Sequence, residues 1–145
     1  MEMKKIKNRY TREIMCGGKS LQEIIALHKE YLNYSEIGKR ADLTDADLRC
    51  ADLTNADLGW ANLTNADLTG ADLTRADLRW ADLRGADLRG AVLTVVNLTD
   101  ANLTRANLTG ADLTDADMTN AYLTRAVLTN ADPKAKKRNS RRKNP

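Results

Sequence analysis

The chain has 145 residues, a net charge of +3 and 4% aromatic residues, with no phenylalanine. This length suits one domain, and so few aromatic side chains argue against an irregular globular core. No apolar run approaches the roughly 18 residues of a membrane span, and the basic start leads into no signal-peptide segment. Two cysteines and one histidine are too few for a disulfide framework or a zinc cluster. We therefore expect a cytoplasmic protein that needs no cofactor and no metal.

Charge is segregated along the chain, and this predicts three segments. Residues 1–40 carry nine Lys/Arg against five Glu, which gives a net charge of +4. Residues 41–132 carry seven Arg against fifteen Asp, a net charge of −8, and residues 133–145 carry seven basic residues and no acid. Such a layout informs about partners more than the overall charge does.

A helix is predicted over about residues 21–32. Ser20 and Glu23 have the spacing of a capping box, and Asn33 with Gly38 marks the exit of the helix. Apolar or aromatic residues recur between them at helical spacing: Leu21, Ile24, Ile25, His28 and Leu32. A shorter helix is expected over residues 9–16. The longer helix can lay its apolar face on the structure that follows it.

From residue 41 to residue 130 the chain repeats a five-residue unit eighteen times, with the pattern Ala-(Asp/Asn)-Leu-x-x. The first position is Ala in seventeen units, and the third is Leu in seventeen. A period of five smears leucines around a helix and sends them to alternating faces of a straight strand. All leucines share one interior only if the chain turns a corner once per unit. The pattern therefore predicts a β-helix with an alanine and leucine lumen.

Decorations of the unit suggest how many corners close one coil. Trp60 and Trp80 are twenty residues apart, as are Gly70, Gly90 and Gly110. This recurrence favours four units per coil, although eighteen units are few enough for it to arise by chance.

The tandem A(D/N)LXX units resemble the pentapeptide-repeat family over residues 41–130. The resemblance implies an all-β fold, a right-handed quadrilateral parallel β-helix, here with a short α-helical N-terminal cap. The segments are then a cap over 1–40, a β-helix over 41–132 and a disordered basic tail over 133–145. The quinolone-resistance branch of this family forms dimers through a C-terminal apolar helix. No segment of this sequence matches that helix, so the last coil either pairs directly with another copy in a homodimer or is frayed.

Aspartates at the second position of the unit are expected to stack into acidic columns. Proteins of the quinolone-resistance branch are thought to imitate DNA and bind type II topoisomerases such as DNA gyrase through acidic faces. The alternative is that these side chains accept hydrogen bonds from backbone amides near corners, which is consistent with Asn at four of these positions. Arginines also interrupt the acidic field. The columns comprise Asp47, Asp67 and Asp87, and Asp57 with Asp77.

Outward-facing apolar side chains are the candidate partner-binding residues. Trp60 and Trp80 end their units, one coil apart, and exposed tryptophans are favoured interface anchors. Alternatively, they pack flat against the rod or under the N-terminal segment. Two smaller patches consist of Val92 with Val95, and Tyr122 with Val127, the second lying where a dimer contact would form.

The basic tail is a candidate nucleic-acid-binding arm. It could equally be solvated or fold back on the acidic body. It carries no aromatic residue, so base-specific recognition is not expected. Its basic residues are Lys134, Lys136, Lys137, Arg138, Arg141, Arg142 and Lys143.

No nucleophile, acid–base pair or metal-ligand set is recognisable in the sequence. His28 is interpreted as a residue of the N-terminal helix, and Cys50 as an exposed thiol at a corner. The sequence thus favours a non-catalytic rod that binds a protein partner. The alternatives are a DNA-mimicking modulator of type II topoisomerase and a structural spacer in a phage or multiprotein assembly.

Overall fold

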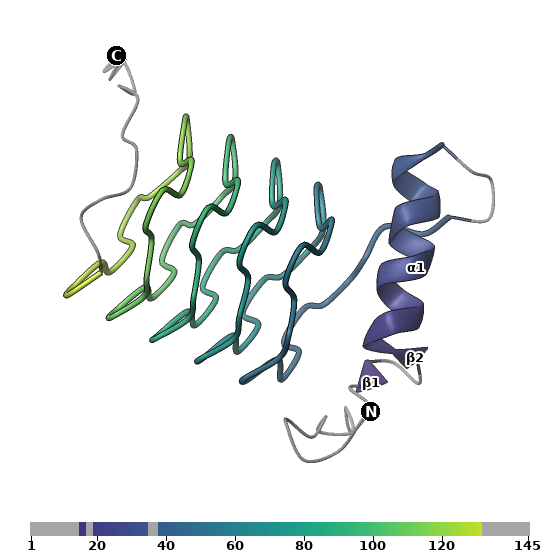
Figure 1. Ribbon diagram of the computed structural model, residues 1–145, viewed down its shortest axis with the longest axis horizontal. Coiled ribbons are helices and arrows are strands. Elements are labelled where there is room, and N and C mark those ends of the chain that lie inside the picture. The colour runs from purple at the N-terminus through teal and green to yellow at the C-terminus, as the bar shows by residue number, and fades with distance from the viewer. Residues whose placement is uncertain (1–14, 17–18, 35–37, 132–145) are drawn as a thin grey trace.

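The computed structural model of the chain describes residues 15–16, 19–34 and 38–131. Three elements precede the repeats: strand β1 (Met15–Cys16), strand β2 (Lys19–Ser20) and helix α1 (Leu21–Leu32). Figure 1 shows α1 at one end of a stack of coils, with the last described repeats, coloured yellow-green, at the opposite end. The repeats lie side by side along this stack.

Adjacent coils are joined by parallel β-bridges between residues twenty positions apart, from Asp42–Asn62 to Asn107–Val127. This register confirms four units per coil. Each unit contributes only one bridged residue before the chain turns, so the described repeats form isolated bridges instead of long strands. Backbone hydrogen bonds reinforce each bridge: the Leu43 N–H donates to the Asn62 carbonyl at 2.7 Å.

Each corner is a β-turn that the repeat builds from its last two positions. The N–H of the next alanine donates to the leucine carbonyl, as from Ala46 to Leu43 at 3.1 Å. The fifth residue of all eighteen units has a positive φ, between 54° and 68°. A left-handed residue at the third turn position is the hallmark of a type II turn. Glycine, asparagine and aspartate, which tolerate a positive φ, accordingly fill eleven of the eighteen fifth positions.

Alanines and leucines of the repeats fill the lumen. Leu63 and Leu83, one coil apart, are both fully buried. The buried repeat residues form one continuous apolar cluster that also includes Leu21 and Ile24 of α1. Each buried leucine stabilises the fold by roughly 1.5–3 kcal/mol, so stability accumulates along the stack.

Helix α1 has the predicted bounds and the predicted capping box. The Glu23 N–H donates to Ser20 Oγ, and the Ser20 N–H donates to Glu23 Oε2. The helix ends at Leu32 with Asn33 as its C-cap. Leu21, Ile24 and His28 lie on its buried face.

The helix expected over residues 9–16 is wrong at its end, because Met15–Cys16 forms strand β1. This strand pairs antiparallel with β2, Met15 opposite Ser20 and Cys16 opposite Lys19. Two glycines separate the strands in the sequence, and Gly-Gly favours a tight hairpin turn over a helix. Residues 9–14 lie outside the described part of the chain.

Candidate functional site

Trp60 and Trp80 form a stacked pair on one corner of the coil. Their ring centroids are 5.1 Å apart and the ring planes differ by 10°. The two residues are 51% and 48% exposed. The expectation that these side chains point outward agrees with the exposure, and they pack against each other along the axis of the rod.

The backbone at these tryptophans is in the left-handed region, with φ of 66° at Trp60 and 62° at Trp80. Glycine and asparagine tolerate this region best, and eight of the eighteen corners carry one of them. For a residue without that tolerance, this backbone conformation raises the free energy of the folded state by on the order of 1–3 kcal/mol. Large rings thus occupy corners where the backbone favours small or amide side chains.

Helix α1 covers the residue next to this pair. Gly59 is buried, and a Cβ there would lie 3.9 Å from Leu32 Cδ2. Trp60 follows Gly59 directly and remains half exposed. We define the tryptophan corner as the column of fifth-position residues in this register, Trp60, Trp80, Asp100 and Asn120.

Val92 and Val95 differ in their surroundings. Val92 is half-buried, in register with Asp72 and Asp112 on the neighbouring coils. Val95 is exposed at a corner with φ of 60°, a conformation that β-branched residues rarely adopt. The repeat pattern alone does not reveal the backbone strain at Val95. It predicts a corner in each unit but not the left-handed conformation of the fifth residue.

Tyr122 and Val127 lie on the last coil, in register with Asn102 and Asn107. Tyr122 is 61% exposed and Val127 is also exposed. Leu128 occupies the third position of its unit, where the leucines of the middle coils are buried, but it is 38% exposed. Sequence reasoning missed Leu128, although its position in the last unit, with no repeat following it, could have indicated exposure.

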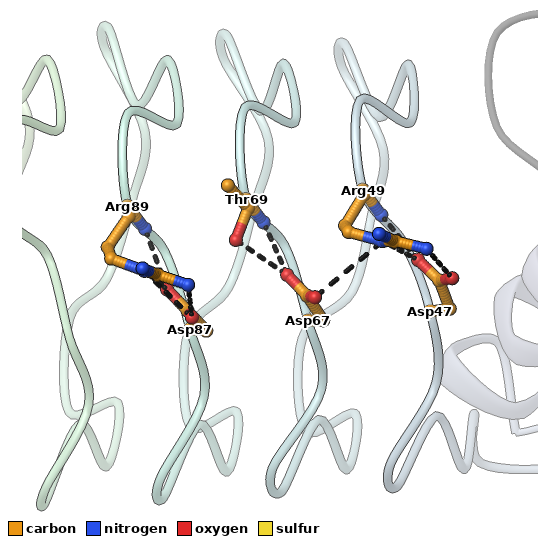
Figure 2. A network of polar contacts seen from close by, with 6 residues as sticks. All are labelled: Asp47, Arg49, Asp67, Thr69, Asp87 and Arg89. Atoms are coloured by element: carbon orange, nitrogen blue, oxygen red, sulfur yellow. Dashed lines mark hydrogen bonds and ion pairs between the residues drawn. The ribbon is translucent and has the colours of Figure 1, made fainter.

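The predicted acidic columns exist as columns: Asp47, Asp67 and Asp87 are bridged in succession, and Asp57 is bridged to Asp77. Figure 2 shows Arg49 beside Asp47 and Arg89 beside Asp87, with Thr69 beside the middle aspartate, Asp67. Arg49 pairs with Asp47 at 2.5 Å and lies 3.7 Å from Asp67.

Each arginine at the fourth position of a unit pairs with the aspartate two residues before it. These arginines are Arg49, Arg79, Arg84 and Arg89. Arg89 pairs with Asp87 at 2.6 Å, and Arg79 pairs with Asp77 at 2.5 Å. The hydrogen bond from Arg89 lowers the pKa of the Asp87 carboxyl. The hydrogen bonds that Arg49 donates to the Asp47 carboxylate likewise raise the pKa of the Arg49 guanidinium. The hydrogen-bonded Asp87 carboxyl, with its lowered pKa, therefore stays ionised to lower pH than usual, and Arg89 compensates its charge.

The second-position side chain also has a structural role. The Asp67 carboxylate accepts the Thr69 N–H at 3.0 Å and its hydroxyl at 2.6 Å. Asn62 accepts the same two donors from Thr64, at 3.2 and 2.7 Å. Aspartate and asparagine therefore serve equally as the acceptor that begins each corner, which is the alternative considered from the sequence.

Cys50 is exposed at a corner, as expected. The basic-tail residues lie outside the described part of the chain. Among the residues described, no three His, Cys, Asp or Glu side chains gather as a metal site would require. The described helix is too short to cross a membrane.

The twenty-residue register, the alanine and leucine lumen and the left-handed corners together define a parallel β-helix of five-residue repeats. The family model for pentapeptide repeats matches residues 39–59, 51–90 and 91–130, with eight copies. The chain belongs to the pentapeptide-repeat family.

Solved structures agree with this assignment. A pentapeptide repeat protein from the Arabidopsis thaliana thylakoid lumen is 38% identical, with a TM-score of 0.62 over 63% of this chain and 64% of that chain. The chain thus spans a little under two thirds of that protein. A pentapeptide repeat protein (Rfr23) from the cyanobacterium Cyanothece 51142 is 35% identical, with a TM-score of 0.56 over 69% of this chain and 67% of that chain.

A more distant likeness carries no functional argument. Full-length QnrB1, a plasmid-mediated fluoroquinolone resistance protein, is 22% identical, with a TM-score of 0.30 over 66% of this chain and 59% of that chain. None of the curated proteins compared with the chain matches it.

Proposed function

We propose that the chain is a non-catalytic protein-binding rod whose partner docks on the tryptophan corner. One observation carries this proposal: two stacked, half-exposed indoles occupy left-handed corners where glycine or asparagine would be less strained. Stacking of the two rings contributes about 0.5–1.5 kcal/mol, which is less than the strain of two such corners. Exposed tryptophans supply much of the binding energy at protein interfaces.

The double variant Trp60→Asn/Trp80→Asn tests this proposal. Asparagine tolerates the left-handed corner, so the variant should fold at least as stably as the wild-type chain. Proteins that co-purify with the tagged chain are identified by mass spectrometry, and the recovered partner is titrated against both forms. Binding should weaken at least tenfold in the double variant.

Arg75→Asn is the matched control, because Arg75 also occupies an exposed left-handed corner, with φ of 58°. Its binding should equal that of the wild-type chain. Equal partner affinity of the tryptophan variant and the wild-type chain would retire the tryptophan corner as the interface.

Within this proposal, residues 1–40 act as a helical cap and residues 41–132 as the rod, with right-handed coils. Contacts between α1 and the first coils support the cap: Leu21 and Ile24 share their apolar cluster. An uncovered first coil would present an open lumen and exposed backbone edges. We place the protein in the cytoplasm.

DNA mimicry at a type II topoisomerase is the second candidate function. The stacked carboxylates of Asp47, Asp67 and Asp87 favour it, and the pairing of Arg49 and Arg89 with this column weakens the acidic field. A DNA gyrase supercoiling assay with the purified chain tests it. If the chain neither inhibits nor protects DNA gyrase at micromolar concentration, this candidate is removed. The proposal of a protein-binding rod would not be affected by that result.

Two further interactions belong to the proposal. A homodimer would form through the last coil, where Tyr122, Val127 and Leu128 are exposed. Sedimentation of the Tyr122→Asn variant and of the wild-type chain measures it, and the variant should dimerise more weakly.

The tail over residues 133–145 would bind nucleic acid through charge, and its deletion should abolish salt-sensitive retention on DNA. If the partner, DNA and dimer tests all fail, the rod is best described as a structural spacer.

A further inference from the structure

A fully buried histidine holds helix α1 to the first coil. His28 is 0% exposed, and its Nδ1 accepts the backbone N–H of Ala41, the first residue of the first repeat, at 3.0 Å. An imidazole nitrogen that accepts a hydrogen bond carries no proton. The docked ring is therefore neutral, with its hydrogen on Nε2.

The second ring nitrogen, Nε2, is enclosed without a well-placed acceptor among the described residues. The Tyr31 ring stacks on the imidazole, with centroids 5.7 Å apart and planes 15° apart. The site thus suits a neutral ring.

Two charged groups influence His28: Asp57 of the first coil, and Arg40, the residue just before the first repeat. Burial is the largest influence and lowers the pKa of His28 below its usual 6.5. The Gly59 backbone and the charge of Asp57 favour the protonated ring, and the charge of Arg40 disfavours it. The balance of these effects keeps the docked imidazole neutral.

Protonation removes the contact that joins the helix to the coil. A proton on Nδ1 would turn the acceptor into a donor that faces the Ala41 N–H. We propose that protonation of His28 releases helix α1 from the first coil, so that the N-terminal cover of the β-helix opens in mild acid. This inference does not depend on the function proposed above.

The direction of the effect follows from proton binding in the two states. A released ring in water binds a proton near pH 6.5, whereas the docked ring binds it only at lower pH. The docking equilibrium therefore weakens as pH falls below 6.5 and levels off below the pKa of the docked ring.

Release would uncover the lumen of the first coil. Leu21 and Ile24 would leave the apolar cluster that they share with Ala41 and Leu43. Leu32 would leave Gly59, the residue before Trp60. The hydrogen bond that the Lys39 N–H donates to the Leu27 carbonyl would break as the helix leaves.

Nuclear magnetic resonance of the full chain tests the proposal directly, because the chain has one histidine. The ring resonances should titrate below pH 6.5. Over the same range, the exchange protection of the Ala41 amide, relative to its intrinsic rate, should fall about tenfold per pH unit. A ring that becomes protonated while Ala41 stays protected overturns the proposal.

His28→Asn is the decisive variant, since its Oδ1 can accept the Ala41 N–H in place of Nδ1 and does not titrate. Its Ala41 protection should match the wild-type value at neutral pH and stay level through mild acid. Loss of protection at the same pH in variant and wild type would overturn the proposal. If the variant does not fold, the wild-type titration decides alone.

Discussion

The two ends of the rod share one repeat but differ in what lies over it. At the first coil, Ala41 and Leu43 are buried in a cluster that includes residues of α1. At the last coil, Leu123 is only partly buried and Leu128 is 38% exposed. The repeat supplies an interior along the whole stack, and burial at an end needs residues from outside the repeat.

Leucine truncation gives the largest expected effect and tests this comparison directly. Leu83 is fully buried, with Leu63 and Leu103 in register on the neighbouring coils. Leu83→Ala should destabilise the chain by about 3–5 kcal/mol, because it loses apolar contacts and leaves a cavity. Leu128→Ala should cost about 1 kcal/mol or less. Urea unfolding followed by tryptophan fluorescence measures both.

Equal losses at Leu83 and Leu128 would break the comparison. They would mean that the end of the stack is as well packed as its middle in solution. Thr124→Ala on the exposed surface of the last coil is a control that should change the unfolding midpoint little.

Removing the capping box tests the covered end on its own. Ser20→Ala leaves the Glu23 N–H without its side-chain acceptor, and such a loss costs about 1 kcal/mol. Amide exchange in α1 should speed up, while exchange in the middle coils should not change. Ser20→Asp keeps an acceptor and should behave as the wild-type chain does. Faster exchange throughout the rod would mean that the helix and coils unfold as one unit.

The sequence predicted the interior of the rod well. A five-residue step leaves no other way to bury every leucine, and the recurrence of Trp60 and Trp80 indicated the register. It did not predict the corner conformation, because the fifth position holds tryptophan, arginine and valine as well as glycine and asparagine. Backbone geometry common to all eighteen units overrides these local preferences.

The candidate site was predicted only in part. The corner position of the tryptophans followed from the register, but their mutual stacking depends on side-chain angles that a repeat pattern does not specify. The Arg49–Asp47 pair could have been predicted, since residues two apart in an extended segment share a face. Strain at Val95 could not be recognised without the left-handed corner.

Val95 offers a stabilising substitution that tests the corner away from both ends. Valine at φ of 60° is strained, so Val95→Asn should stabilise the chain by about 1 kcal/mol. Thermal or urea unfolding measures the gain. At Arg75, on the same column of corners with φ of 58°, the change to Asn should give a smaller gain because arginine is not β-branched. A less stable Val95→Asn chain would show that valine contributes packing that outweighs the strain.

The smallest effect separates charge from hydrogen bonding along the acidic column. Asp67 accepts two hydrogen bonds from Thr69, and Arg49 lies 3.7 Å away. Asp67→Asn should leave the urea midpoint unchanged, because Asn62 makes the same contacts with Thr64 and an exposed ion pair contributes little. Asp67→Ala should lose about 1 kcal/mol, since the Thr69 N–H loses its acceptor. Equal losses in both variants would instead assign the stabilisation to the negative charge, and the column would then be an electrostatic feature of the fold.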